Sequence, residues 1–186
     1  SLLKASEEAV GLLPGQFGNS EVGHMTIGAG RRLKQDIDRI NEFLEENIKE
    51  DENYKEMIEK CKETNSTIHI MGLFSDGLVH SDMNHFFKTY DCLVKSGIDK
   101  INFHLITDGR DTSTESAYGY IKQLEDKIKE TKVGSIATIC GRFYAMDRDN
   151  KLDRTKKYYD LLTRRIGEST TNIKKTIDEY YRKGIT

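Results

Sequence analysis

The sequence is poor in residues that cross-link or stiffen a chain, with three cysteines and one proline in 186 residues. Cys61, Cys92 and Cys140 lie far apart and are odd in number. This pattern suits free thiols better than a disulfide framework or a zinc site. The cysteines are expected to be free thiols in a reducing compartment, which predicts a cytoplasmic protein.

Long apolar runs and an excess of one charge are also missing. No stretch approaches the length of a transmembrane helix, and the first residues, SLLKASEEAVG, lack the apolar core of a secretory signal. The formal net charge is only −2, although 32% of the residues are charged, so no strong field favours nucleic acid or an anionic membrane. Mixed charges with regular apolar periodicity are typical of a folded globular protein and not of a disordered one.

The sequence does contain three successive units of the same kind, each an apolar run, a polar loop and an amphipathic helical pattern. The predicted strands are Thr67–Leu73, Ile101–Ile106 and Ser135–Cys140. The loops and helices that follow them are Ser75–Ser81 and Met83–Ser96, Thr107–Ser113 and Thr114–Thr131, and Gly141–Asn150 and Asp153–Arg165. Such βα units form parallel sheets with right-handed crossovers. The predicted fold class is therefore α/β, with flanking helices and the three loops along one sheet edge.

Leu2–Val10 is predicted to be the end of a helix, and helical spacing of apolar residues predicts three more helices, at Asp36–Asn47, Asn53–Thr64 and Thr171–Lys183. Gly11 is expected to end the first of these helices in a left-handed conformation. A Gly-rich stretch, 15–30, comes before the second helix, and we place a domain boundary near Lys34. The predicted domains are residues 1–34 and residues 35–186.

The polar loops carry a histidine, three arginines and an aspartate: His80, Arg110, Arg142, Arg148 and Asp111. If the loops share one edge, the cations among them converge on an anion site. Arginine matches the oxygens of a phosphate or a carboxylate bidentately, so a small ligand with both groups would fit. A carboxylate among arginines stays ionised unless it is buried, so Asp111 could accept a proton from a hydroxyl of the ligand.

Structural roles for the same residues remain open at this point. Arg142 and Arg148 could form ion pairs within their own loop, with Asp147, Asp149 or Asp153. Asp111 could only cap the helix that begins near Thr114, because the preceding segment is rich in capping residues. His80 could be an ordinary loop histidine with no ligand.

The Gly-rich stretch contains a serine, Ser20, at the expected start of a helix. A hydroxyl there faces the positive end of the helix dipole and unpaired N–H groups, which together can hold a phosphate. The alternative is that Ser20 only caps the helix. His24 lies four residues further on, where it could act as a base toward Ser20 or be a packing residue.

Four segments resemble the cofactor-independent phosphoglycerate mutase family and occur in the family's order. They are LLPGQFGNSEVGHMTIGAGR, MGLFSDGLVHS, DGRDT and GRFYAMDRDNKLDR. The resemblance implies that Ser20 becomes phosphorylated and that Asp111 moves protons between the two glycerate hydroxyls. It assigns substrate binding to His80, Arg110, Asp111, Arg142 and Arg148. Leu78 replaces a glycine common in the family, which is expected to stiffen the first loop and leave His80 in place.

The implied reaction interconverts 3-phosphoglycerate and 2-phosphoglycerate in glycolysis and gluconeogenesis. It is an isomerase reaction by intramolecular phosphotransfer, in which a phosphoserine intermediate splits one transfer into two. The resemblance implies two divalent ions, Mn²⁺ or Mg²⁺, that activate Ser20, and no requirement for 2,3-bisphosphoglycerate. It also implies a monomer, with a substrate-binding (transferase) domain preceded by a short piece of an alkaline-phosphatase-like metal-binding domain.

The family's chain is much longer, and its other metal ligands fall outside this sequence, so Ser20 is the one metal-site residue it contains. We therefore interpret the sequence as a fragment and expect no turnover from it alone. Two other functions stay open. The loops could form a binding module for a phosphorylated acid without turnover. The protein could instead be a metal-dependent phosphatase, which would not need Asp111 and should tolerate Asp111→Asn.

Overall fold

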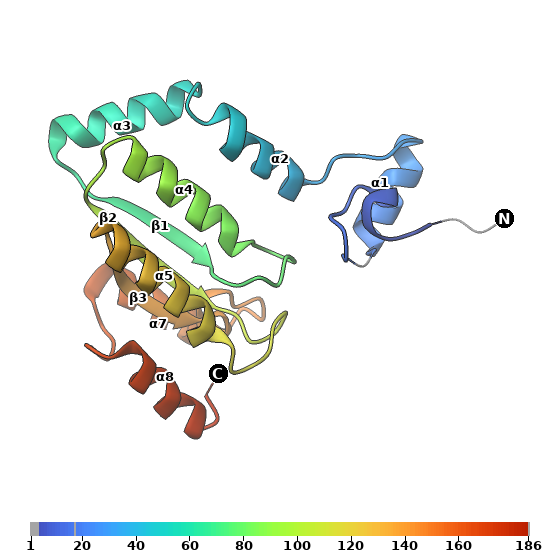
Figure 1. The fold of residues 1–186 in the computed structure, drawn as a ribbon. Helices are drawn as coiled ribbons and strands as arrows, with labels where there is room; N and C mark the ends of the chain where they lie inside the picture. The colour runs from blue at the N-terminus through green and yellow to red at the C-terminus, as the bar shows by residue number, and fades with distance from the viewer. Residues whose placement is uncertain (1–3, 17, 186) are drawn as a thin grey trace. The chain divides into compact units, whose positions relative to one another are not determined.

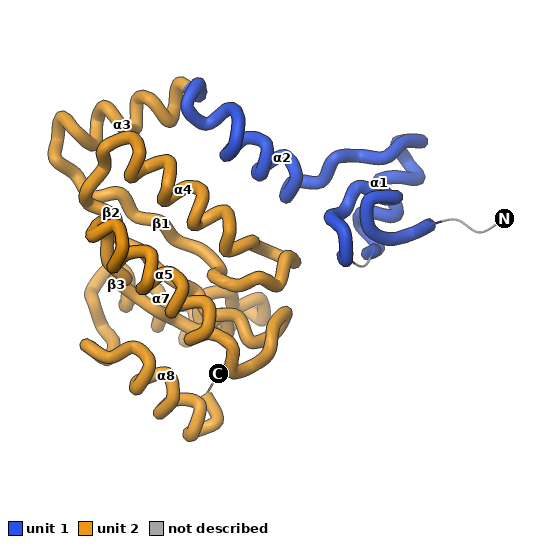
Figure 2. The backbone as a smooth tube through the Cα atoms, in the orientation of Figure 1, with its two compact units in different colours: residues 1–51 blue, residues 52–186 orange. Residues whose placement is uncertain are grey.

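A computed structural model describes residues 4–16 and 18–185 of the chain. The chain divides into two compact units, Ser1–Asp51 and Glu52–Thr186 (Figure 2). The division falls between two of the helices predicted from the sequence, Asp36–Asn47 and Asn53–Thr64. The domain boundary predicted near Lys34 concerns the domains of the family and stays a prediction.

The first unit is built from short helices. They are the 3-10 helix η1 (Glu7–Val10), α1 (Ser20–Ala29), and α2 (Asp36–Glu42), which continues as the π-helical turn η2 (Phe43–Asn47). Gly11 follows η1 at φ 84°, as predicted, and a Cβ there would meet the carbonyl oxygen of Leu33 at 2.0 Å. The helix predicted for Leu2–Val10 is only the single turn η1 in the described residues, and Leu2 and Leu3 lie outside them.

The second unit contains a three-stranded parallel sheet in the order β1-β2-β3 (Figure 1). The strands are β1 (Ile68–Leu73), β2 (Ile101–Thr107) and β3 (Ser135–Gly141). The central strand, β2, pairs with both neighbours, and its register with β3 shifts between Phe103 and His104. Because all three strands run the same way, the loops that follow them leave from one edge of the sheet. The predicted α/β fold class is confirmed.

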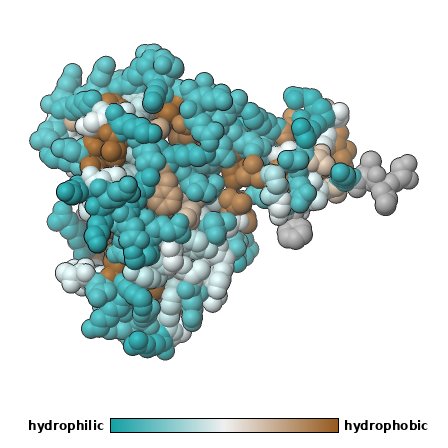
Figure 3. Space-filling model, in the orientation of Figure 1, coloured by the Kyte–Doolittle hydropathy of each residue, from teal (hydrophilic) through white to brown (hydrophobic). Residues whose placement is uncertain are grey.

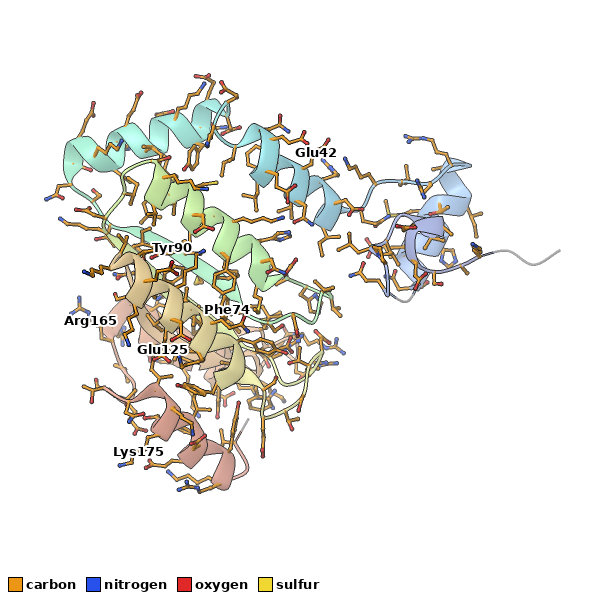
Figure 4. The ribbon with its side chains drawn as sticks, in the orientation of Figure 1. Glu42, Phe74, Tyr90, Glu125, Arg165 and Lys175 are labelled. Carbon is orange, nitrogen blue, oxygen red and sulfur yellow. The ribbon has the colours of Figure 1, made fainter. Side chains whose placement is uncertain are left out.

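Helices α4 (Met83–Lys95) and α5 (Ala117–Thr131) cover one face of the sheet (Figure 1). Fully buried side chains fill the space between them, including Phe103 of β2, Tyr90 of α4 and Leu124 of α5. Tyr90 points into this core (Figure 4), where its hydroxyl donates to the carbonyl of Val133 at 2.7 Å. A buried tyrosine needs such a partner. This core fixes the strands whose ends carry the polar loops.

Further helices of the second unit are α3 (Glu52–Thr64), α6 (Arg142–Ala145), α7 (Leu152–Arg164) and α8 (Ile173–Arg182). The short helix α6 is a correction, since the sequence predicts only loop there. Helix α5 begins at Ala117 and not at Thr114, because residues 113–116 form a turn in which the Ser116 N–H donates to the carbonyl of Ser113 at 3.2 Å. Hydrophilic residues cover most of the face seen in Figure 3, and no described helix is long and apolar enough to span a membrane.

Candidate functional site

The loops that follow the three strands meet at the carboxyl edge of the sheet. They cover residues 74–82, 108–116 and 142–151, the last of which includes the short helix α6, and we call them the first, second and third loop. The first loop begins where the Phe74 N–H donates to the carbonyl of Ile106 in β2 at 2.8 Å. It ends where the Met83 N–H donates to the carbonyl of Ser75 at 2.9 Å. Strand pairing and these hydrogen bonds hold the loops together.

Asp108, at the start of the second loop, joins all three loops. Its side chain is 1% exposed and accepts hydrogen bonds from the Ser75 hydroxyl (2.7 Å) and the Arg142 guanidinium (2.8 Å). It also accepts the backbone N–H groups of Arg110 (3.1 Å) and Asp111 (3.0 Å). Burial alone would raise the pKa of Asp108, but these four donors lower it to about 2. The carboxylate is therefore ionised at physiological pH.

Arg142, the first residue of α6, bridges two carboxylates. Its Nη1 lies 2.6 Å from Oδ2 of Asp111 and 2.8 Å from Oδ1 of Asp108, and its side chain is 13% exposed. Burial would lower the pKa of Arg142, but the hydrogen bonds to Asp111 and Asp108 raise it. Two of the structural roles left open by the sequence are thus wrong. Arg142 does not pair within its own loop, and Asp111 pairs with Arg142 and does not cap α5.

His80 lies beside this ion pair. Its Nε2 is 3.9 Å from Oδ2 of Asp111, and its side chain is 51% exposed. Leu78, two residues earlier, adopts φ 57°, in the left-handed region that favours glycine. Gly77 lets the first loop approach the second, because a Cβ there would come within 3.1 Å of the Asp111 Cβ. A strained turn and a close approach of the two loops therefore bring His80 next to Asp111.

Arg110 and Arg148 differ from Arg142 in their surroundings. Both residues are exposed. Within the described part of the chain, neither guanidinium has a hydrogen-bond or ion-pair partner. An arginine without a partner can bind a phosphate or carboxylate bidentately. The arginines of the predicted anion site are thus of two kinds, one held in place by carboxylates and two available to a ligand.

A further arginine, Arg154 of α7, holds the third loop. Its Nη1 lies 3.3 Å from a carboxylate oxygen of Asp147 and 3.3 Å from one of Asp149. Its guanidinium lies 3.9 Å from the centre of the Phe143 ring, a cation–π contact. The Asp147 side chain is 2% exposed and also accepts the Lys151 N–H at 2.8 Å. Sequence reasoning missed Arg154, although the alternating charges of DRDNKLDR were a signal for ion pairing in this segment.

Ser20 belongs to the first unit, where it is exposed and is the first residue of α1. The helix is capped by Asn19, whose side chain accepts the Val22 N–H at 3.0 Å. The alternative that Ser20 is the cap is therefore wrong. The Ser20 hydroxyl remains available at a helix start, where a phosphate is favoured.

His24 contacts Ser20 in two ways. Its Nδ1 lies 3.2 Å from the Ser20 hydroxyl oxygen and 2.6 Å from the Ser20 carbonyl oxygen. Because a carbonyl oxygen only accepts hydrogen bonds, Nδ1 carries the proton in this arrangement and cannot take one from the hydroxyl. His24 is exposed, so it is not a packing residue either. Ser20 thus has no base in His24 as the residues stand.

Among residues 4–16 and 18–185, no three His, Cys, Asp or Glu side chains come together in a way that could hold a metal ion. The two divalent ions implied by the resemblance therefore do not fit the described residues alone.

Known proteins match nearly the whole of this chain. The family model of the BPG-independent PGAM N-terminus (iPGM_N) matches residues 40–186. The chain is 47% identical over 187 residues to a 2,3-bisphosphoglycerate-independent phosphoglycerate mutase of Parabacteroides distasonis, and 41% identical over 183 residues to one of Syntrophotalea carbinolica. The alignments cover 100% and 98% of this chain but 37% and 36% of those relatives.

A solved structure is also similar. It is a crystal structure of Leishmania mexicana phosphoglycerate mutase at low cobalt concentration, with a TM-score of 0.87 and 28% sequence identity. The match covers 98% of this chain and 35% of that one. The family model spans most of the sequence and includes all three loops of the site. The chain therefore belongs to the BPG-independent phosphoglycerate mutase family.

Proposed function

We propose that this chain is part of a 2,3-bisphosphoglycerate-independent phosphoglycerate mutase, an isomerase that interconverts 3-phosphoglycerate and 2-phosphoglycerate in glycolysis and gluconeogenesis. The observation that carries the proposal is the arrangement at the sheet edge. There Asp111 is paired with Arg142 at 2.6 Å and lies 3.9 Å from His80, with two unpaired arginines on the same loops. The names of the relatives support the same reaction.

In this proposal the loops bind the glycerate and its phosphate. Arg110 and Arg148 take the anionic groups, because they have no competing partner among the described residues. Arg142 and His80 complete the anion site. Asp111 takes a proton from one glycerate hydroxyl and returns it to the other, which is general base and acid catalysis by one carboxylate.

Ser20 accepts the phosphoryl group while the glycerate stays on the loops. Two divalent ions, Mn²⁺ or Mg²⁺, would activate the hydroxyl and neutralise the phosphoryl oxygens. The described residues hold no cluster of three candidate ligands, so the ions would need ligands from other parts of the protein. We therefore propose that this chain alone binds substrate and does not turn it over.

The proposed domains follow from the proposed roles of the loops and of Ser20. Residues 35–186 are proposed to be part of the substrate-binding (transferase) domain, and residues 1–34 a piece of the alkaline-phosphatase-like domain that carries the nucleophile. We propose a cytoplasmic monomer that acts on a small molecule and on neither nucleic acid nor membrane.

A binding module without turnover is the second candidate. One observation favours it, because the described residues build anion-binding loops and no metal site. A metal-dependent phosphatase is the third candidate, and in it Asp111 has no proton to carry between two hydroxyls.

Replacing Asp111 in the full-length protein, assayed with Mn²⁺, distinguishes these functions. For a mutase, Asp111→Asn should lower interconversion by about 100-fold or more, since one general acid–base group contributes roughly that much. Asp126→Asn on α5, which removes an exposed carboxylate paired with Lys122, is the matched control and should be neutral. Phosphate release that survives Asp111→Asn would indicate a phosphatase. No turnover by the unsubstituted protein would indicate a binding module.

A further inference from the structure

Asp108 has no assigned part in the proposed reaction, yet the three loops are joined through it. Its side chain is 1% exposed, whereas the side chains of Asp111 and His80 are 17% and 51% exposed. A ligand entering from solvent therefore meets Asp111 and His80 and does not reach Asp108. Any effect of Asp108 on binding must act through the residues it holds.

The two oxygens of Asp108 hold different parts of the site. Oδ1 accepts the N–H groups of Arg110 and Asp111, which fixes the turn that carries this pair. The same oxygen accepts Nη1 of Arg142 from the third loop. Oδ2 accepts the Ser75 hydroxyl, which ties the first loop to the second.

Arg142 shares one nitrogen, Nη1, between Asp108 and Asp111. If Asp111 were its only partner, an anionic ligand that attracted the guanidinium would draw Arg142 away or pull Asp111 with it. A second, buried carboxylate opposes that movement, because breaking its charge-assisted hydrogen bond would leave an unpaired buried charge. Burial would raise the pKa of Asp108, but its hydrogen-bond donors lower it and keep the carboxyl ionised. The ion pair between Asp108 and Arg142 is therefore present at physiological pH.

We propose that Asp108 is a positioning residue of the site, whose carboxylate holds Arg142 and Asp111 in the arrangement that receives the phosphorylated glycerate. The proposal rests on the proposed function for the identity of the ligand. The claim that Asp108 orders Arg142 is independent of that function, because the order of Arg142 can be measured without any ligand.

Three variants of this chain separate the charge of Asp108 from its shape. Asp108→Asn keeps an oxygen for the two backbone N–H groups and a group that can bond to Ser75, but removes the charge that holds Arg142. Ser75→Ala removes one hydrogen bond from an uncharged donor and keeps the charge of Asp108. Asp82→Asn is the matched control, since Asp82 is also buried but only caps α4, by accepting the Asn84 N–H at 2.8 Å, and Asn caps equally well.

Two quantities are measured for each variant: the Kd for 3-phosphoglycerate by calorimetry, and the order of the Arg142 side chain by ¹⁵N relaxation of its Nε–H group. Asp108→Asn should weaken binding about tenfold or more and make Arg142 mobile on the nanosecond scale. Ser75→Ala should weaken binding about threefold at most. Asp82→Asn should change neither quantity. A purely structural role would lower the melting temperature and leave the order of Arg142 in the folded protein unchanged.

The outcomes distinguish this proposal from the proposed function. Unchanged affinity and unchanged order of Arg142 in Asp108→Asn overturn the positioning role, whereas binding by the unsubstituted chain still supports the function. If the unsubstituted chain does not bind 3-phosphoglycerate but Asp108→Asn frees Arg142, the positioning of Arg142 stands and the ligand assignment fails. If Asp108→Asn does not fold, Asp108→Glu decides, because the longer side chain keeps the charge but moves the carboxylate away from the position in which it accepts Nη1 of Arg142. An affinity and an order of Arg142 equal to those of the unsubstituted chain would then overturn the proposal.

Discussion

At the scale of single residues, the arginines of the candidate site differ in burial and in their partners. Arg142 is nearly buried and bonded to two carboxylates, so it shapes the site. Arg110 and Arg148 are exposed and have no partner in the described residues, so they contribute little to the stability of the fold. This division predicts which substitutions affect binding alone.

Arg110→Ala and Arg148→Ala should each weaken binding of 3-phosphoglycerate about tenfold or more, because each removes a charge-assisted contact to the ligand. Neither should change the free energy of unfolding by more than about 0.5 kcal/mol. Calorimetric titration and urea unfolding measure the two effects. Arg164→Ala is the control, since Arg164 ends α7 about 18 Å along the helix from its start beside the third loop. If either variant binds 3-phosphoglycerate with unchanged affinity, the arginine that it lacks does not belong to the site.

The pKa of Asp108 predicts a pH dependence of stability. Burial would raise this pKa, but the hydrogen-bond donors lower it from an ordinary value of 3.8 to about 2. Folding therefore favours the charged carboxylate. Its contribution, about 2 kcal/mol, is fully present above about pH 4 and is lost as the pH falls toward 2.

Urea unfolding between about pH 6 and about pH 2, which is roughly the span of this titration, tests the direction of this pH dependence. The unfolding free energy of Asp108→Asn should fall by about 2 kcal/mol less than that of the unsubstituted chain over this range. Equal losses in the two proteins would show that the Asp108 carboxyl is not stabilised in its charged form.

The residue types of the site were predictable from the sequence, and their partners were not. Arginine, histidine and aspartate in loops after three apolar runs indicate an anion site without any coordinates. The role of Asp108 depends on which backbone N–H groups a tight turn points at its carboxylate. That direction depends on backbone angles which the order of the amino acids does not display.

At the scale of helices and strands, the three βα units were predictable because apolar runs, polar loops and helical spacing alternate regularly. The ends of elements were less so. Helix α6 was missed because its four residues lie in a charged loop and are too few to show a helical period. Helix α5 begins later than predicted because its capping-rich approach forms a turn first.

Gly72 in β1 allows α4 to pack closely against the sheet. A Cβ there would lie 2.9 Å from the ring of Phe86, which is itself buried in the core. Gly72→Val should therefore destabilise the fold by about 1–3 kcal/mol through overpacking. Gly119→Ala is the matched control in α5, where a Cβ meets nothing within 4 Å, and should be stabilising by about 0.5–1 kcal/mol. Urea unfolding that ranks the two variants in the opposite order would contradict this packing.

Arg154 predicts a local effect on the third loop. Arg154→Met keeps much of the apolar volume but leaves Asp147, which is 2% exposed, without its ion pair. We expect a loss of about 1–3 kcal/mol in unfolding free energy and faster hydrogen exchange within residues 142–151. The double substitution Asp147→Asn with Arg154→Met should recover part of the loss, because no unpaired buried charge remains. Exchange that rises equally in the first loop would argue against a local role.

At the scale of the whole molecule, the loops proposed to bind the anion and the proposed nucleophile, Ser20, belong to different compact units. His80, Asp111 and the three arginines lie in the unit 52–186, together with a hydrophobic core formed from that unit's own residues. Ser20 lies in the unit 1–51. The proposed reaction uses such a division, with one part holding the glycerate while another part holds the phosphate. The chain spans only about 37% of the length of the Parabacteroides distasonis relative.

The most direct test of the account is a titration of this chain with 3-phosphoglycerate, followed by NMR chemical shifts, with Arg110→Ala as the control. We expect saturable shifts that cluster on His80, Arg110, Asp111, Arg142 and Arg148 and that need a concentration about tenfold higher or more to saturate in the control. Shifts scattered over the surface, or no saturation at all, would contradict the claim that the three loops form the glycerate site.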